Sequence, residues 1–227
     1  TATHGGVARP AVLVVARAII SDFTLTPPSI TGGYNVTGEI MLNGPAPEGG
    51  ANVNFTVDNP VVTVPIKVTI PGGLTSRTFL VRTSPVASTV LVPIVAVRAG
   101  QSKTAVLQVI RPVMHSVTLS PLVAGGGEEV QGTAWLNGPA PEGGVTVELT
   151  SSADVATVPP TVHIPSGSRN ATFPIATSAV SVRTTSIIRG TWLGVIKGAV
   201  LTVQPTTMQS IVAIPSTVNR GANANFT

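Results

Sequence analysis

Two kinds of charged residue recur at a fixed spacing in this chain of 227 residues. Glu48 returns as Glu142, and Lys103 returns as Lys197, each 94 positions further along the chain. These are the only charges that recur among the matched positions. An active site built into each copy would need more of them, so the pattern favours a chain without catalytic residues.

The sharpest chemical interpretation of the recurring residues is an isopeptide crosslink between a lysine and an asparagine, assisted by a buried glutamate. The residues for it are Asn43, Glu48 and Lys103 in the first copy and Asn137, Glu142 and Lys197 in the second. The ordinary alternative is a turn Asn, a turn Glu and a solvated Lys. We favour this alternative because Asn and Glu beside Pro and Gly are ordinary turn chemistry.

No other cluster of reactive side chains recurs. The three histidines meet residues of other types at the equivalent positions of another copy, so no set of metal ligands repeats. They are His4, His115 and His163. The chain has no cysteine, no G-x-S-x-G turn and no Asp-rich calcium loop. We predict that the chain is not an enzyme and carries no cofactor and no metal.

The spacing of 94 residues belongs to a long internal repeat. When Ile20–Val113 is placed over Met114–Thr207, 38 positions match without a gap. The matches are apolar residues of strand-like segments, together with the Gly and Pro residues that mark turns. From its length alone the chain could form one domain or two. The internal repeat predicts two.

The longest match is the segment N-G-P-A-P-E-G-G, found at 43–50 and at 137–144. Its prolines fix φ and cannot donate to a sheet ladder, while its glycines tolerate positive φ. We interpret it as a stiff turn that holds two strands in register; a ligand-binding loop is the alternative. The predicted turn residues are Asn43, Gly44, Pro45, Pro47 and Glu48 in the first copy and Asn137, Gly138, Pro139, Pro141 and Glu142 in the second.

Short alternating segments between the turns predict β-strands. Val145, Val147 and Leu149 fall on one face of such a segment, and Val53 and Phe55 repeat that face in the first copy. Val, Thr and Ile are abundant, and no segment reads as an amphipathic helix. We expect an all-β protein of tandem β-sandwich repeats of about 94 residues, with about seven strands each.

The repeat continues past both copies. Residues 11–15, A-V-L-V-V, align with Ala105–Val109, and Met208–Gly221 aligns with Met114–Gly127. The chain therefore reads as a window cut from a longer array.

This alignment predicts the domain limits. We expect residues 1–17 to be the C-terminal strand of a preceding repeat, 18–112 the first repeat, 113–206 the second, and 207–227 the N-terminal part of a following repeat. The incomplete ends would expose unpaired strands. They would be covered by neighbouring repeats or, through β-strand addition, by identical subunits.

The charge and the hydropathy of the chain limit the kinds of partner that we expect it to bind. The net charge is only +4, and the arginines are scattered singly, so we expect no nucleic-acid binding. The longest apolar stretch, Ala11–Ile20, is interrupted by Arg17 and is half the length of about 20 residues that a membrane helix needs, so we expect no membrane span. The charged fraction of 10% leaves apolar side chains facing outward, which favours assembly.

Several matched motifs follow one another in a fixed order. V-x-G at 36–38 and 130–132 precedes L-N-G-P-A-P-E-G-G, then V-P, I-P-x-G, T-F and A-V-L-x-V. In these motifs the chain resembles the tandem immunoglobulin-like (Ig-like) repeats of large bacterial cell-surface and secreted proteins, over nearly its whole length. The resemblance implies Ig-like β-sandwiches, an exported array, and work as a spacer, adhesin stalk or fibre. It brings no catalytic residues.

Three functions follow from these observations. The leading one is a non-catalytic structural protein that builds an extracellular fibre, stalk or surface layer of a bacterium and assembles with itself. The second is an adhesin or binding module for glycan or protein, although equal loop lengths and few aromatic residues argue against it. The third is an accessory region of a secreted enzyme. All three place the chain outside the cell or on its surface.

Overall fold

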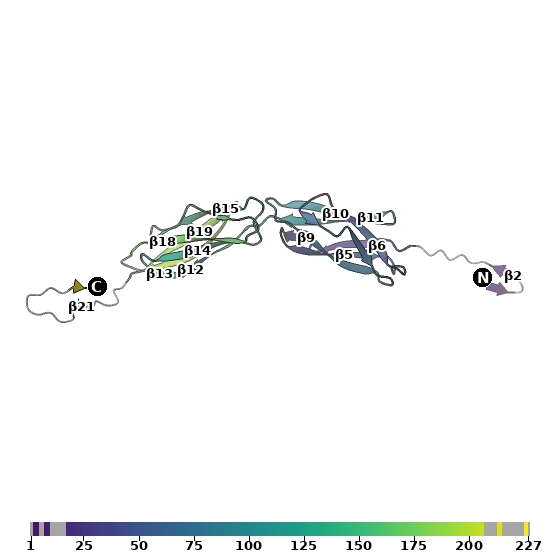
Figure 1. Cartoon of the computed structure of the whole chain (residues 1–227), viewed down its shortest axis with the longest axis horizontal. Coiled ribbons are helices and arrows are strands. Elements are labelled where there is room, and N and C mark those ends of the chain that lie inside the picture. Colours follow the sequence, from purple (N-terminus) through teal and green to yellow (C-terminus); the bar gives the residue numbers. More distant parts are fainter. Residues whose placement is uncertain (1, 5–6, 10–16, 207–212, 215–224, 227) are drawn as a thin grey trace, which may run out of the picture. The chain divides into compact units, whose positions relative to one another are not determined.

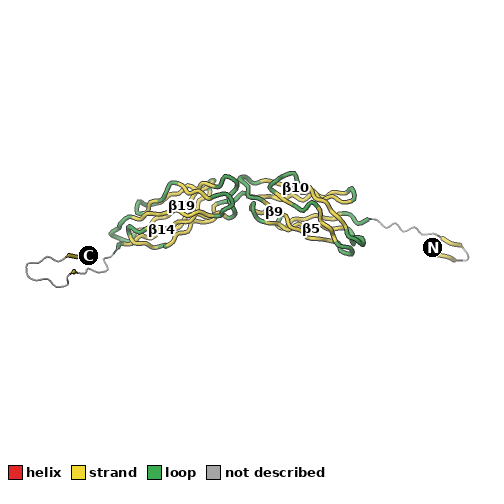
Figure 2. The backbone as a smooth tube through the Cα atoms, in the orientation of Figure 1, coloured by secondary structure: helices red, strands yellow, loops and turns green. Residues whose placement is uncertain are grey.

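The computed structural model describes residues 2–4, 7–9, 17–206, 213–214 and 225–226. The chain divides into two compact units, Thr1–Pro112 and Val113–Thr227 (Figure 1). Every regular element of the described residues is a β-strand, and the rest is loop and turn (Figure 2). Within the described residues, no helix has the length and the apolar character needed to span a membrane.

The first unit is a sandwich of two sheets. One sheet has the order β3-β5-β9-β7, and the other has the order β4-β11-β10-β6-β8. All pairs are antiparallel except β4 with β11. The strands are β3 (Ile20–Thr26), β4 (Ser29–Thr31), β5 (Asn35–Leu42), β6 (Ala51–Thr56), β7 (Val62–Thr63), β8 (Lys67–Ile70), β9 (Ser76–Thr83), β10 (Val90–Arg98) and β11 (Gln101–Ile110).

The second unit has the same two sheets, in the orders β12-β14-β18-β16 and β13-β20-β19-β15-β17. Each of its strands begins 94 residues after its counterpart in the first unit. Each sandwich has seven strands of four or more residues and two shorter ones. The strands are β12 (Met114–Ser120), β13 (Val123–Gly125), β14 (Glu129–Leu136), β15 (Val145–Ser151), β16 (Ala156–Thr157), β17 (Thr161–Ile164), β18 (Asn170–Thr177), β19 (Thr184–Trp192) and β20 (Val195–Gln204). The predicted all-β fold class of Ig-like sandwiches is confirmed.

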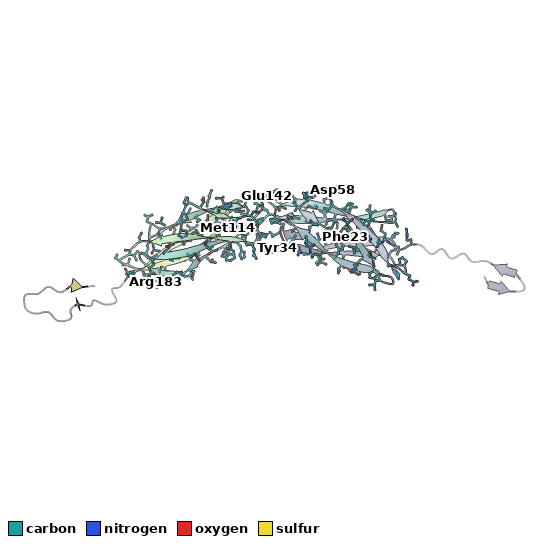
Figure 3. All side chains as sticks on the ribbon, in the orientation of Figure 1. Phe23, Tyr34, Asp58, Met114, Glu142 and Arg183 are labelled. Atoms are coloured by element: carbon teal, nitrogen blue, oxygen red, sulfur yellow. The ribbon has the colours of Figure 1, made fainter. Side chains whose placement is uncertain are left out.

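Each unit has its own apolar core between its two sheets. The expected face of Val145, Val147 and Leu149 is buried, while the residues between them are exposed, as period-two alternation requires. Figure 3 draws the side chains, with buried Phe23 labelled in the first unit and buried Met114 in the second. In the first unit three rings pack together, with the ring centroids of Phe55 and Phe79 4.6 Å apart.

Two short hairpins lie outside the sandwiches. β1 (Ala2–His4) pairs with β2 (Val7–Arg9), and β21 (Ala213–Ile214) pairs with β22 (Asn225–Phe226), both antiparallel. Residues 11–15, predicted to form a strand of a preceding repeat, lie outside the described residues. The predicted domain limits, including those of the terminal segments, stay predictions.

Candidate functional site

The N-G-P-A-P-E-G-G segment joins β5 to β6 in the first unit and β14 to β15 in the second. β5 and β6 belong to different sheets of the sandwich, and so do β14 and β15. The prediction that the segment holds two strands in register is therefore wrong, because the two strands it joins are not paired with each other. The segment crosses from one sheet to the other.

Ala46, in the middle of the segment, binds the turn between β8 and β9. Its N–H donates to the carbonyl of Leu74 at 2.8 Å, and its carbonyl accepts from the N–H of Gly73 at 2.9 Å. The methyl group of Ala46 is buried in the core. The segment therefore has an anchor of two backbone hydrogen bonds and one buried side chain.

The second half of the segment is a tight turn. The N–H of Gly50 donates to the carbonyl of Pro47 at 2.8 Å. Gly49 has a φ of 89° and Gly50 a φ of 86°, which is backbone that side chains disfavour. Glu48 is exposed at this turn, where its carboxylate faces solvent.

The second unit repeats this arrangement bond for bond. Ala140 donates to Ser168 at 2.8 Å and accepts from Gly167 at 2.9 Å, and Gly144 donates to Pro141 at 2.9 Å. Two of the matched motifs, N-G-P-A-P-E-G-G and I-P-x-G, are thus the two sides of one contact. Their conservation between the copies has a structural cause that the sequence alone did not reveal.

Asn43 joins the segment to the start of the repeat. Its N–H donates to the carbonyl of Ile19 at 3.0 Å, and its side-chain Oδ1 accepts from the N–H of Ile19 at 2.9 Å. Asn137 holds Val113 in the same way, at 3.1 and 2.8 Å. The amide oxygen thus takes the place of a backbone carbonyl.

The remaining predicted turn residues are glycines, prolines and one glutamate. They are Gly44 and Pro45 in the first copy and Gly138, Pro139 and the exposed Glu142 in the second. A Cβ added to Gly44 would have no neighbour within 4 Å. That these residues form a structural turn, and not a ligand-binding loop, stays a prediction that the hydrogen bonds above support.

The two recurring lysines lie on sheet surfaces. Lys103 stands opposite Ala96 in the β10–β11 ladder, and Lys197 stands opposite Gly190 in the β19–β20 ladder. Both lysines are exposed. Glu48 and Glu142 are exposed as well, so neither supplies the buried carboxylate that would assist an isopeptide bond. The crosslink stays a prediction that protein mass can test.

Thr83 and Thr177 are structural residues that sequence reasoning missed. The Thr177 hydroxyl donates to the carbonyl of Glu128 at 2.6 Å, lies 3.1 Å from the carbonyl of Gly125, and accepts from the N–H of Gly127 at 3.1 Å. Thr83 makes the equivalent bonds to Tyr34 and Gly33. The signal was present, since Thr recurs here at the common spacing. Threonine is so frequent in this chain that the match did not stand out.

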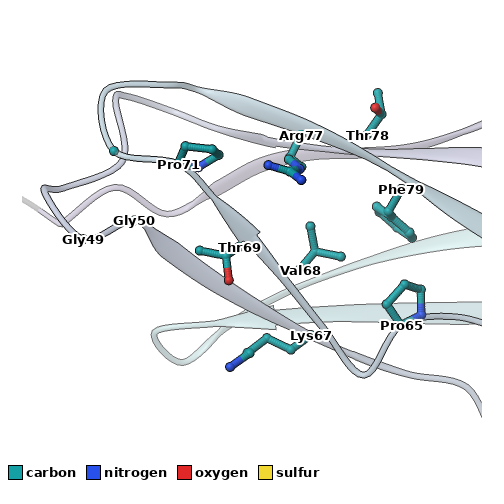
Figure 4. A pocket seen from close by; sticks show the side chains of 11 residues that line it. Gly49, Gly50, Pro65, Lys67, Val68, Thr69, Pro71, Arg77, Thr78 and Phe79 are labelled. Atoms are coloured by element: carbon teal, nitrogen blue, oxygen red, sulfur yellow. The ribbon is translucent and has the colours of Figure 1, made fainter.

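A cavity of the first unit, about 660 Å³, lies between β8 and β9. Figure 4 shows Val68 and Thr69 on one of these strands and Arg77 and Phe79 on the other. Lys67 also lines it. At the equivalent positions of the second unit, 161 and 171, Lys67 and Arg77 are replaced by Thr and Ala. The charge of this cavity is therefore a property of one repeat and not of the repeat pattern.

A second cavity of the first unit, about 330 Å³, is lined by two arginines, Arg17 and Arg98. The Arg98 Nε donates to the carbonyl of Ala18 at 3.1 Å, and its Nη1 donates to the carbonyl of Asn52 at 2.9 Å. Burial, and after it the neighbouring charge of Arg17, lower the pKa of Arg98 from its usual value. The guanidinium is thus held in place beside a second positive charge.

Histidines form no metal centre in the part of the chain that the structure describes. His115 and His163 are exposed on different strands, and no group of three or more His, Cys, Asp or Glu gathers there. His4 lies in β1, where its side chain is outside the description.

Comparisons with known proteins find likeness only at the level of structure. No protein-family model matches the chain, and no curated protein sequence matches it. The chain is similar to invasin, a bacterial integrin-binding protein, with 10% identity and a TM-score of 0.49 over 84% of this chain and 40% of that one. It is similar to the Yersinia pseudotuberculosis adhesin InvE, with 15% identity and a TM-score of 0.36 over 84% and 64% of the two chains.

A third similar structure covers domains 4–9 of the surface layer protein SbsC, with 14% identity and a TM-score of 0.33 over 89% of this chain and 33% of that one. The chain thus spans less than two thirds of the length of each of these three structures.

Proposed function

We propose that this chain is a length of a non-catalytic extracellular protein, in which Ig-like sandwiches follow one another as a fibre, stalk or surface layer of a bacterium. The observation that carries the proposal is the pairing register of the two terminal hairpins. Each pair of residues in these hairpins has an equivalent pair, 94 residues away, in a hairpin of a complete repeat.

The N-terminal hairpin has the register of the last hairpin of a repeat. It pairs Ala2 with Arg9, and 94 residues later Ala96 pairs with Lys103 in the β10–β11 ladder. All three of its pairs have such counterparts. Register is a strict criterion, because a slip of one residue would turn every side chain to the other face.

The C-terminal hairpin has the register of the first hairpin of a repeat. It pairs Ala213 with Phe226, and 94 residues earlier Leu119 pairs with Gly132 in the β12–β14 ladder. We therefore interpret residues 1–17 and 207–227 as parts of a preceding and a following repeat. Their missing strands come from neighbouring repeats of the same chain or, through β-strand addition, from identical subunits.

The recurring contacts also favour a structural role over a catalytic one. The residues that recur make backbone hydrogen bonds between loops, as Ala46 and Ala140 do. Of the charged cavity residues, Lys67, Arg77 and Arg98 have no charged counterpart in the second unit, and Arg17 alone recurs, as Arg111. Exposed apolar side chains lie on the sheets of both units, among them Leu91, Val106 and Val200, exposed by 65%, 51% and 52%. Apolar surface of this kind is typical of proteins that associate.

The array hypothesis can be tested by completing the third repeat. Residues 134–206 of the second unit are appended after Thr227, which corresponds to Thr133, so that the hairpin β21–β22 gains the rest of a sandwich. We expect a third cooperative unfolding transition and slow amide exchange at Ala213 and Phe226. A control with one extra residue at the junction shifts the register and should not fold. Equal behaviour of the two chains would overturn the interpretation.

The location and assembly of the protein need a separate measurement. We expect antibodies against the two-unit chain to label intact producing cells, and negative-stain images of the purified protein to show regular filaments. Labelling only after the cells are lysed would contradict an extracellular role. Images of isolated beads at high protein concentration would contradict self-assembly and leave the stalk as the remaining structural role.

A further inference from the structure

The cavity between Arg17 and Arg98 has the chemistry of an anion site. Two guanidinium groups line it, and none of its described lining residues is acidic. Like charges held side by side repel each other unless an anion lies between them. Nothing in the proposed structural role requires this arrangement, so it calls for an explanation of its own.

Two of the donors in this cavity, Arg98 and Asn52, are held in place by hydrogen bonds within the unit. The bonds from Arg98 to the carbonyls of Ala18 and Asn52 use Nε and Nη1 and leave Nη2 for a ligand. Asn52 accepts a hydrogen bond at Oδ1 from the hydroxyl of Thr69 at 2.7 Å, so its amide N–H groups remain available as donors. Asn54 adds a second amide to the lining. Donors that are already oriented lose little entropy on binding.

We propose that this cavity binds an oxyanion, the carboxylate or sulfate group of a small polar ligand, between Arg17 and Arg98. Guanidinium groups bind such groups through charge-assisted N–H···O bonds. The cavity volume of about 330 Å³ exceeds what an inorganic ion fills, and the amides of Asn52 and Asn54 suit hydroxyl groups. An acidic sugar residue would use both parts of the site, and a free inorganic anion would use only the arginines.

The second repeat supplies a natural comparison. At positions 111, 146, 148 and 192 it has Arg, Thr, Glu and Trp in place of Arg17, Asn52, Asn54 and Arg98. One arginine is thus replaced by an uncharged ring, and one amide by a carboxylate that repels anions. We expect the site in the first repeat only. It therefore distinguishes two units that otherwise share their fold.

The test is a titration of the whole chain at constant ionic strength, followed by amide and indole resonances in NMR spectra. The probes are inorganic sulfate, glucuronate and uncharged glucose. We expect sulfate and glucuronate to shift the side-chain amides of Asn52 and Asn54 and to leave the Trp192 indole unchanged. Tighter binding of glucuronate than of sulfate identifies an acidic sugar as the source, and the reverse identifies a free anion. Equal shifts with glucose, or no saturable shift, would overturn the proposal.

Variants distinguish binding at this cavity from a general attraction of anions to the positive net charge of the chain. Arg17 is exposed, so Arg17→Gln should leave the fold intact and weaken sulfate binding about threefold or more, the effect of one surface charge contact. Arg98→Trp copies the second repeat and should abolish binding. The matched control is Arg82→Gln, which removes an exposed arginine of the other sheet and should leave the dissociation constant unchanged. An equal loss of sulfate affinity with Arg82→Gln would show that only the net charge matters and would overturn the proposal.

Discussion

The ring of Phe173 lies directly over Gly132. The two residues are cross-strand partners in the β14–β18 ladder, and a Cβ on Gly132 would stand 2.3 Å from Cε2 of the ring. Phe79 covers Gly38 in the same way in the first unit, where the closest ring atom would be 2.5 Å from the added Cβ. The recurring V-x-G and T-F motifs thus form one contact, in which glycine leaves room for a ring.

Gly132→Ala is expected to destabilise the second unit. The added methyl group would have to displace the Phe173 ring from a packed position, which costs about 1–3 kcal/mol. Both tryptophans of the chain, Trp135 and Trp192, lie in the second unit, so urea unfolding followed by tryptophan fluorescence reports on that unit. The double variant Gly132→Ala/Phe173→Leu should lose less than the sum of the two single variants. Full additivity would show that the ring and the glycine do not interact.

Much of the fold could be predicted from the repeat, because the same turn residues recur at one spacing and bound segments that alternate in polarity. The buried face of Val145, Val147 and Leu149 followed from alternation alone. The partners of each motif could not be predicted. Two copies of equal length show which positions are constrained, but they do not show which of those positions touch.

The loop segment illustrates this limit. Gly and Pro residues between two strands also fit a hairpin turn, and only the sheet order shows that β5 and β6 lie in different sheets. The hydrogen bonds of Ala46 could not be predicted either, because they are made by its backbone and the alanine side chain does not indicate a partner. The arginine pair could not be predicted from recurrence, because Trp192 stands at the position equivalent to Arg98 in the second copy.

Thr177→Val is expected to destabilise the second unit by about 1 kcal/mol, because it removes the hydroxyl that donates to the carbonyl of Glu128 and accepts from the N–H of Gly127. Thr177 itself is only 8% exposed, and valine keeps the shape of its side chain. Tryptophan fluorescence in urea measures the change. Thr150→Val on an exposed strand position should stay within about 0.5 kcal/mol. A similar loss of unfolding free energy in both variants would show that the Thr177 hydroxyl contributes no more to stability than an exposed threonine hydroxyl.

Asn137→Ala is expected to speed hydrogen exchange at the Val113 amide. That N–H donates to the Asn137 side chain, and removing the acceptor should also lower unfolding free energy by about 1 kcal/mol. Exchange is followed residue by residue in NMR spectra. Asn137→Asp retains an oxygen acceptor and should keep the Val113 amide protected. If Asp and Ala accelerated exchange equally, the amide oxygen would not be the group that holds Val113.

The intact mass of the purified chain is expected to equal the mass of its sequence. The exposed positions of Lys103 and Glu48 and the bond from Ile19 to the Asn43 oxygen disfavour an isopeptide bond. A crosslink would release one ammonia for each repeat, which mass spectrometry detects. Lys103→Arg keeps the charge but cannot crosslink, so its mass should differ from the wild-type mass by the substitution alone. A wild-type mass lower by one or two ammonia molecules would establish the crosslink.

Leu193→Asn is expected to stabilise the second unit. Leu193 has a φ of 48° and Gly194 a φ of 77° in the two-residue turn between β19 and β20. A left-handed backbone costs an ordinary side chain about 1–2 kcal/mol, whereas Asn-Gly is the preferred pair for such a turn. Replacing the leucine removes little buried apolar surface, because Leu193 is 55% exposed. We expect a gain of about 0.5–1 kcal/mol in urea unfolding followed by tryptophan fluorescence.

The control for this gain is Leu122→Asn. Leu122 is 58% exposed but is not among the residues with positive φ, so the same exchange there should bring no stabilisation. Ala99, with a φ of 50° in the equivalent turn of the first unit, offers the matched test, since Ala99→Asn should raise the stability of that unit. An equal gain from Leu122→Asn would assign the effect to the removal of exposed apolar surface. Stabilisation at Leu193 and Ala99 alone would assign it to the left-handed backbone that the two repeats share.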